Sequence, residues 1–469
     1  MWHSSRVHDA RPEDAPLERA LSTTDATLVT VGATLGTGIF LTTAAVAQSA
    51  PDPRGILLLW LGGGLLALAG ALTYAELGSM FPQAGGQYVY LKEAYGPLVG
   101  FLFGWVSFFV IMTGGIAVLA VGFGEYLGAF LPFFSTGHPL WSVALPGGLV
   151  WTATGAQLAA AVAIAGLTAV NYIGVVAGTR FQNVVTAAKI LALVALGGAG
   201  LLLPARPGTF ANAPSIFPMG LAAAGVGMIA VQWTYDGWYG ATFMAGEMKN
   251  PARSLPIGIV TGTAIVTALY VLMNVVYLRA LPVAELARTP RVAEASALAL
   301  FGAGGGRMIT ALVLVTIFGC LASTILYPPR IYLPMSRDGL FFAALGRVHP
   351  VYRTPAASLV AQAIWGILLT FSGTYEQLYT YVIFAVFLFH AATGLAVVVL
   401  RRRRPESPRA FRVPAYPWIP LVFVGACAAL VANTLVEKPM ESGIGLAILA
   451  AGVPAFLFWR RRASAKAAR

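Results

Sequence analysis

The feature of this sequence that most constrains its fold is a series of twelve apolar stretches, most of them at least twenty residues long. A helix needs about 20 apolar residues to cross a bilayer. Charged residues make up only 10% of the chain, whereas soluble proteins carry about 25%. The sequence therefore predicts an all-α membrane protein with twelve transmembrane helices. Their expected bounds are 26–50, 55–80, 96–131, 151–174, 181–204, 216–246, 255–281, 306–337, 355–372, 375–400, 416–436 and 441–460.

The basic residues predict how these helices are oriented. The chain has 30 Lys and Arg against 18 Asp and Glu, for a net charge of +12. With residues 1–25 in the cytoplasm as an N-terminal tail, 22 of the 30 fall in cytoplasmic segments, as is usual for membrane proteins. The positive charge is thus explained by topology, and we expect no nucleic-acid partner. Both termini, 1–25 and 461–469, are predicted to be cytoplasmic in a multi-pass protein of the cell membrane.

The polar residues exclude several classes of function. The two cysteines, Cys320 and Cys427, lie in separate apolar stretches with no metal-ligand spacing. No nucleotide-binding loop of the GxxxxGK[ST] type occurs. We therefore expect no metal, no cofactor and no catalytic residues, which argues against an enzyme. The basic run 401–404 is expected to contact membrane lipid.

Two blocks of five spans, 26–204 and 216–400, have a similar order, and 416–460 adds two further helices. Each block opens with a helix interrupted by glycine and polar residues, around 36–38 and 235–238. Paired interrupted helices are typical of transporters built from inverted repeats, with the ligand site at the breaks.

At the first break, Gly36 and Gly38 let the helix unwind, and the half-helix that restarts at Ile39 presents backbone amides suited to a carboxylate. The alternative is that the two glycines only allow close helix packing. At the second break, carbonyls freed at Trp233, Thr234 and Asp236 suit an ammonium group. The two breaks together indicate an α-amino acid ligand.

Two charged residues lie within the predicted spans. Asp236 has three possible roles: it caps the unwound turn, binds a cationic side chain, or titrates with protons. Lys189 needs partners, either carbonyls of the first break or the hydroxyls of Ser323 and Thr324. The alternative for Lys189 is a helix-end lysine that reaches the membrane interface.

Smaller signals concern three other polar residues. Glu76 and Glu247 lie near span ends and are expected to pair with basic residues or backbone. His390 lies in an aromatic run and is expected to pack there rather than bind a ligand.

Several motifs resemble the amino acid–polyamine–organocation (APC) superfamily, and the chain looks most like its L-type amino acid transporter family, of the prokaryotic, stand-alone type. They are the segments 36–40, 74–78, 85–88, 235–238, 247–251, 411–414 and 443–446. The resemblance covers nearly the whole chain after the first twenty or so residues. It implies the LeuT-type fold: a 5+5 inverted repeat with broken first and sixth helices, followed by two more helices.

The resemblance also implies roles for site residues. Gly36, Thr37 and Gly38 would bind the substrate carboxylate, and the carbonyl of Thr34 would face the amine. Trp233 would act as a gate over the substrate, and carbonyls of Trp233, Thr234 and Asp236 would receive the amine. Lys189 matches a lysine that takes the place of sodium in sodium-independent members.

Two departures from the animal members bear on partner and substrate. Residues 132–150 contain no cysteine, so no disulfide-linked heavy chain is expected. Asp236 stands where many animal members have glycine, which leaves the substrate class open.

The predicted function is sodium-independent exchange of L-amino acids by alternating access. The alternatives are a proton-coupled symporter that uses Lys189 or Asp236, a cationic amino acid transporter that uses Asp236, and a membrane sensor that binds an amino acid without moving it.

Overall fold

The computed structural model describes residues 17–144, 150–206, 220–372 and 375–467, and within them the chain is helical apart from one small hairpin. The first block contains α1 (Thr23–Thr34), α2 (Gly38–Leu41), α3 (Thr43–Ser49), α4 (Pro53–Met80), α5 (Gln87–Tyr95), α6 (Pro97–Val106), α7 (Met112–Leu127), α8 (Gly155–Tyr172) and α9 (Val175–Leu202). The second contains α10 (Leu221–Tyr235), α11 (Pro251–Ala280), α12 (Val283–Leu286), α13 (Val292–Leu326), α14 (Pro329–Arg337), α15 (Ala356–Thr370) and α16 (Tyr375–Arg403). Two helices follow, α17 (Trp418–Glu437) and α18 (Pro439–Ala467).

The prediction of an all-α membrane protein is confirmed. In the described parts of the chain, ten helical segments are long and apolar enough to cross a membrane. The other two predicted spans correspond to shorter elements: α15, and α10 with the 3₁₀ helix η4 (Gly240–Glu247) that follows it. Residues 216–219 of the predicted sixth span lie outside the described residues.

Both predicted helix breaks are present. The first helix ends at Thr34, and the chain is non-helical at Leu35–Thr37 before α2 begins at Gly38. The sixth ends at Tyr235, and Gly237 has a φ of +106° before η4 begins. A positive φ is accessible to glycine at little cost, which explains why this helix breaks here.

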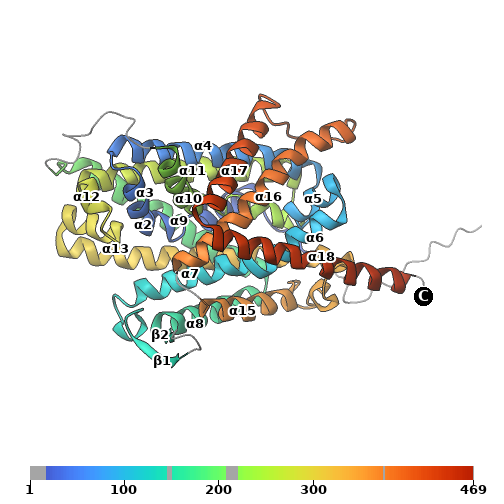
Figure 1. The fold of residues 1–469 in the computed structure, drawn as a ribbon, viewed down its shortest axis with the longest axis horizontal. Helices are drawn as coiled ribbons and strands as arrows, with labels where there is room; N and C mark the ends of the chain where they lie inside the picture. Colours follow the sequence, from blue (N-terminus) through green and yellow to red (C-terminus); the bar gives the residue numbers. More distant parts are fainter. Residues whose placement is uncertain (1–16, 145–149, 207–219, 373–374, 468–469) are drawn as a thin grey trace, which may run out of the picture.

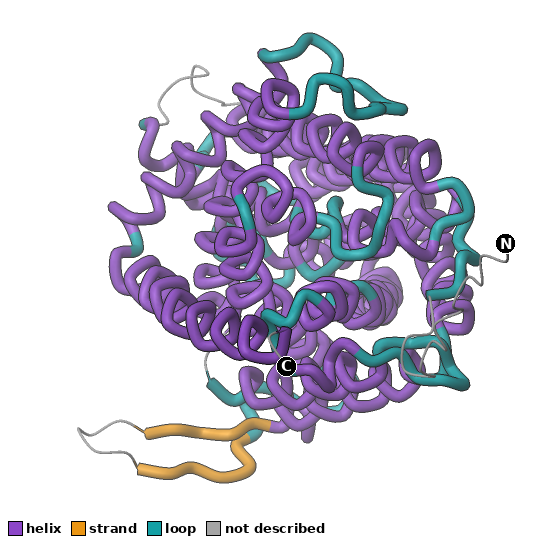
Figure 2. The backbone as a smooth tube through the Cα atoms, turned by 90° about the vertical axis from the view of Figure 1, so that its right-hand side faces the viewer, coloured by secondary structure: helices purple, strands orange, loops and turns teal. Residues whose placement is uncertain are grey.

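The two blocks pack on each other in a reciprocal way. The broken helix α1 lies against α11 of the second block, and the broken helix α10 lies against α4 of the first. The equivalent helices α4 and α11 also pack side by side, and both run along the long axis in the upper part of Figure 1. Seen from the end of this axis, the helices form a bundle (Figure 2). The division of the chain into two inverted repeats, 26–204 and 216–400, stays a prediction.

The structure corrects several predicted boundaries. The span predicted at 151–174 begins in a hairpin, β1 (Pro139–Ala144) paired antiparallel with β2 (Val150–Thr154), which the sequence analysis did not predict. The span predicted at 306–337 begins earlier, at Val292, and is interrupted at Gly302, where φ is +72°. The last helix continues to Ala467, so the predicted tail 461–469 is mostly helical.

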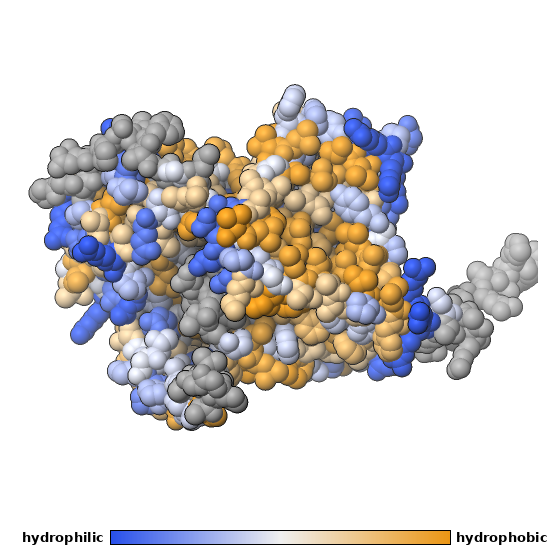
Figure 3. Space-filling model, in the orientation of Figure 1, coloured by the Kyte–Doolittle hydropathy of each residue, from blue (hydrophilic) through white to orange (hydrophobic). Residues whose placement is uncertain are grey.

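The surface also supports a membrane location. An apolar band covers the middle of the molecule, and hydrophilic residues gather at its two ends (Figure 3). In the middle of α9, Val184 and Leu191 are each 70% exposed. Large apolar side chains in this position avoid water only if lipid covers them, so this face of α9 is a lipid-facing surface.

Candidate functional site

The two helix breaks meet at Gly38. A Cβ atom added at Gly38 would lie 2.4 Å from Oγ1 of Thr234 and 2.7 Å from its Cα. A Cβ atom added at Gly237 would lie 2.6 Å from the carbonyl oxygen of Ala33. Because both contacts are shorter than any side chain tolerates, these glycines are what allows the unwound segments to lie against each other.

Lys189 forms hydrogen bonds to the backbone at the first break. It lies on α9, is fully buried, and its Nζ donates to the carbonyl oxygens of Gly32 at 3.3 Å and Leu35 at 3.2 Å. Of its predicted partners, the structure therefore has the carbonyls at the break. The described contacts include none between Lys189 and the hydroxyls of Ser323 or Thr324. The interpretation of Lys189 as a lysine reaching the membrane interface is wrong, because none of its side chain is exposed.

Tyr270 on α11 joins the two breaks directly. Its hydroxyl donates to the carbonyl oxygens of Thr34 at 2.7 Å and Thr234 at 3.0 Å. The carbonyl of Trp233 also has a partner, the amide of Asp236 at 3.2 Å. These carbonyls were predicted to be free for an ammonium group, so each has fewer lone pairs available than expected.

Replacing Tyr270 with phenylalanine is expected to weaken substrate binding about tenfold, because two buried carbonyls lose a donor that is worth about 1–3 kcal/mol. Tyr277 provides a matched control on the same helix. Its hydroxyl is buried and has no hydrogen-bond partner in the described structure. Binding measured by competition should therefore be unaffected in Tyr277→Phe, and equal affinities in the two variants would contradict a bridging role for Tyr270.

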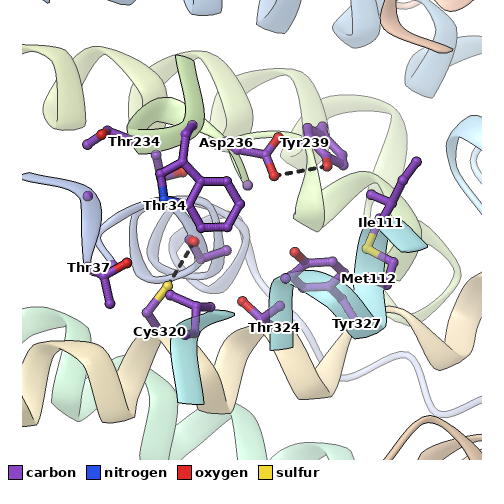
Figure 4. A pocket seen from close by; sticks show the side chains of 17 residues that line it. Thr34, Thr37, Ile111, Met112, Thr234, Asp236, Tyr239, Cys320, Thr324 and Tyr327 are labelled. Carbon is purple, nitrogen blue, oxygen red and sulfur yellow. Dashed lines mark hydrogen bonds between the residues drawn. The ribbon is translucent and has the colours of Figure 1, made fainter. Parts of the chain in front are cut away.

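A buried pocket lies where the breaks meet (Figure 4). Its lining includes eight of the predicted site residues, namely Thr34, Gly36, Thr37, Gly38, Trp233, Thr234, Asp236 and Thr324. Three predicted residues do not line it. Ile39 is buried in α2, Lys189 lies behind the first break, and Ser323 donates its hydroxyl to the carbonyl of Gly319 within α13.

One wall of the pocket was not predicted from the sequence. This wall is formed by residues of α7 and of the π-helix η2 (Ser107–Ile111) that precedes it, namely Ile111, Met112, Gly115 and Leu119. The π-helix adds a residue to a turn, and such insertions often occur at functional sites. In the sequence it is hidden inside one uniformly apolar stretch. Tyr239, Cys320 and Tyr327 also line the pocket and were not predicted.

Asp236 lies at the edge of this pocket and is only partly buried. Its Oδ2 accepts a long hydrogen bond of 3.4 Å from the hydroxyl of Tyr239 (Figure 4). No ion pair of Asp236 occurs among the described residues. A carboxylate in this setting gains most from a positive charge or a proton brought by a ligand.

The three buried polar residues singled out from the sequence have the expected partners. Glu247 forms an ion pair with Arg330 at 2.8 Å, with both side chains fully buried. Glu76 accepts from Arg401 at 2.6 Å. His390 packs in an aromatic cluster, with its Nδ1 2.7 Å from the hydroxyl of Tyr74. These contacts confirm the pairing of the two glutamates and the packing role of His390.

The fold and the pocket together indicate a membrane transporter in which two broken helices meet at a pocket, and comparison with known proteins identifies its family. A model of the amino acid permease family matches residues 21–453. The serine/threonine exchanger SteT of Bacillus subtilis (strain 168) is 31% identical over 96% of this chain and 99% of its own length. The human b(0,+)-type amino acid transporter 1 is 30% identical over 92% of this chain and 86% of its own length, and the human cystine/glutamate transporter is 28% identical over 96% and 87%. The chain belongs to the amino acid permease family, within the APC superfamily.

Proposed function

We propose that this protein is a sodium-independent exchanger of L-amino acids that works by alternating access. The observation that carries the proposal is the pocket at the two helix breaks, lined by backbone from both. The family membership supports an amino acid as the substrate, and the relatives named as exchangers support exchange. The protein binds and moves its substrate and does not transform it.

The substrate would lie between the two breaks. Its carboxylate would meet the backbone amides of Gly38 and Ile39, where α2 begins and the first backbone N–H groups of a helix lack intrahelical partners. Its ammonium would lie near the carbonyls of Thr34 and Thr234, on the lone pairs that Tyr270 leaves available, with the carboxylate of Asp236 nearby. Trp233, which is 7% exposed and lines the pocket, would close over the substrate.

Lys189 would replace a sodium ion in this scheme. In a sodium-coupled carrier a cation binds to carbonyls freed at the break; here the ammonium of Lys189 already binds the carbonyls of Gly32 and Leu35. A fixed positive charge there makes binding of a second cation unfavourable. Transport would therefore not depend on sodium.

The protein would lie in the cell membrane with both termini in the cytoplasm, as the basic residues favour. It would act without a disulfide-linked heavy chain. Both cysteines, Cys320 and Cys427, are buried and unpaired in helices, where a partner chain has no access to them.

Uptake of radiolabelled amino acids into proteoliposomes tests the proposal. We expect uptake to be faster when the vesicles are preloaded with unlabelled amino acid, and unchanged when potassium replaces sodium. The absence of transport for every amino acid would contradict the proposal and favour the sensor. Uptake driven by an imposed pH gradient in unloaded vesicles would favour the proton-coupled symporter instead.

A cationic amino acid transporter is the second candidate, because Asp236 lines the pocket and has no ion pair among the described residues. In the same vesicles this alternative predicts that arginine competes better than leucine and alanine. It also predicts that Asp236→Asn abolishes competition by arginine and leaves competition by alanine in place.

Occupancy of the pocket can be measured at Cys320, whose Sγ lines it. In a Cys427→Ala background Cys320 is the sole thiol of the chain. A small thiol reagent should label it about tenfold more slowly when a transported amino acid is present at roughly ten times its Kd, because the free site is depleted in proportion. D-amino acids that are not transported serve as the control. Labelling that no amino acid slows would place the ligand elsewhere.

A further inference from the structure

A second pocket lies near the start of α1, apart from the pocket at the helix breaks. Three segments supply most of its lining: the residues just before α1, α5 with the loop that precedes it, and α14. Each of these segments contributes one basic side chain, namely Arg19, Lys92 and Arg337. The described residues that line the pocket include no acidic side chain. The pocket is therefore basic.

The two arginines of this pocket are exposed, and neither has an ion pair within the part of the chain that the structure describes. Lys92 differs, because it forms an ion pair of 2.7 Å with Asp338. Asp338 does not line the pocket, and it also accepts a hydrogen bond of 2.6 Å from the hydroxyl of Tyr88. Arg19 and Arg337 thus bring two uncompensated positive charges to one pocket, which favours an anionic ligand.

The types of residue in the lining indicate a ligand that carries phosphate. A guanidinium presents its N–H donors in a planar fork that matches two oxygens of a phosphate group. A carboxylate has one negative charge, whereas a phosphate group carries up to two, which suits two arginines. Leu17, Val89 and Leu333 offer an apolar surface to the rest of the ligand. The cavity volume of about 470 Å³ is within the roughly 300–1,000 Å³ of typical ligand sites.

The pocket lies beside the contacts that connect the start of α1 to α14. Leu21, two residues after Arg19, donates its amide to the carbonyl of Glu247 at 2.9 Å. Glu247 in turn forms the buried ion pair with Arg330 of α14, and Arg337 lies two turns further along the same helix. An anion bound by both Arg19 and Arg337 would therefore join the same two segments at the surface of the molecule.

From these observations we propose that the pocket around Arg19, Lys92 and Arg337 binds a phosphate-bearing anion that holds the start of α1 against α14. The anion slows transport, because α1 moves away from α14 when the substrate pocket opens at this end, and the anion has to leave first. This effect on transport rests on the proposed function, whereas binding does not. The phosphate belongs either to the headgroup of an anionic phospholipid or to a soluble compound of the cytoplasm.

Binding is measured with inorganic phosphate on the purified full-length protein in a neutral detergent. The concentration dependence of thermal unfolding at constant ionic strength gives the Kd. Wild type should be stabilised by phosphate more than by chloride. In Arg19→Gln and in Arg337→Gln the Kd should rise about tenfold, since each variant lacks one charged hydrogen-bond donor. Both side chains are exposed, so these variants keep the fold.

Arg253→Gln is the matched control for this loss of one positive charge. Arg253 is exposed in the first turn of α11, and it does not line the pocket. Its Kd for phosphate should equal that of wild type, which separates binding in the pocket from a general attraction of anions to the basic protein.

Exchange in proteoliposomes tests the effect on transport and separates the two sources of phosphate. In phosphatidylcholine vesicles, inorganic phosphate on both sides at roughly ten times its Kd should slow wild-type exchange about tenfold, because the anion-free form is depleted in proportion. In Arg337→Gln, with its weaker binding, the same concentration should slow exchange only about twofold. Slower exchange in vesicles that contain phosphatidylglycerol, without added phosphate, would identify the lipid as the source. A response to inorganic phosphate alone would identify a soluble compound.

Two results would overturn the proposal. If phosphate does not stabilise wild type, or if the Kd values of Arg19→Gln and Arg337→Gln equal that of Arg253→Gln, the pocket is not a phosphate site. If neither phosphate nor phosphatidylglycerol slows exchange, the bound anion does not hold α1. Absence of any amino acid exchange by wild type would refute the proposed function alone, because the phosphate titration on the purified protein does not depend on transport.

Discussion

Replacing Lys189 with methionine is expected to reduce amino acid exchange about tenfold or more, with the protein still inserted in the membrane. The ammonium of Lys189 donates to the carbonyls of Gly32 and Leu35, on either side of the point where the first helix unwinds. Hydrogen bonds from a charged donor contribute about 1.5–3 kcal/mol each. Methionine retains the length and apolar volume of the side chain and removes the donor, so the unwound segment loses its support while the packing of α9 is preserved.

The measurement is the initial rate of exchange in proteoliposomes, with the amount of protein in the membrane determined in parallel. Val194→Ala is the control on the same helix, since Val194 is 49% exposed on its lipid-facing side. Exchange by Lys189→Met at the rate of Val194→Ala would contradict this role, because it would show that the unwound segment does not need the hydrogen bonds of Lys189. Uptake in Lys189→Met that becomes dependent on sodium would support its proposed role as a replacement for the ion.

Removing one partner of the Glu247–Arg330 ion pair is expected to destabilise the folded protein by about 3–5 kcal/mol, because the other charge stays buried without compensation. Both side chains are completely buried, and two hydrogen bonds of 3.0 Å and 2.8 Å join them. In each of the single variants Glu247→Met and Arg330→Met, we expect most of the protein to be unfolded. The double variant should be more stable than either single variant, because replacing both charges with apolar side chains removes the uncompensated charge.

Thermal unfolding in detergent, followed by the amount of protein that remains monodisperse, measures this effect. The control is Glu285→Gln, which breaks the half-exposed pair of Glu285 and Arg206 and should change stability by about 1 kcal/mol or less. A double variant less stable than both single variants would contradict this account of the ion pair.

The ion pair also has a consequence for alternating access. The carbonyl of Glu247 accepts from the amide of Leu21 at 2.9 Å, just before α1 begins. Arg330, on α14, is therefore connected through Glu247 to the start of the first broken helix. Any motion of α1 that opens the pocket at the end where α1 begins has to break the contacts between Leu21, Glu247 and Arg330, or move all three residues together.

The sequence alone predicted the class of fold and half of the site. Long apolar stretches predict spanning helices because a backbone in lipid has to satisfy its own hydrogen bonds. Glycine and polar residues within such stretches predict breaks, and with them Gly38 and Asp236 at the pocket. A buried charge in an apolar run singled out Lys189. These are local signals, so they are visible without knowledge of the neighbours.

The remaining features depend on contacts between distant segments, which only the tertiary structure decides. Nothing in the sequence distinguishes Tyr270, which joins the two breaks, from Tyr277 seven residues later, whose hydroxyl has no hydrogen-bond partner in the described structure. Gly115 differs from Gly36 only in the empty space beside it. Composition and spacing determine that this chain forms broken helices in a membrane. Which side chains reach the breaks, and how much room is left between them, is determined by how the helices pack, because a pocket is the space that neighbouring helices leave unfilled.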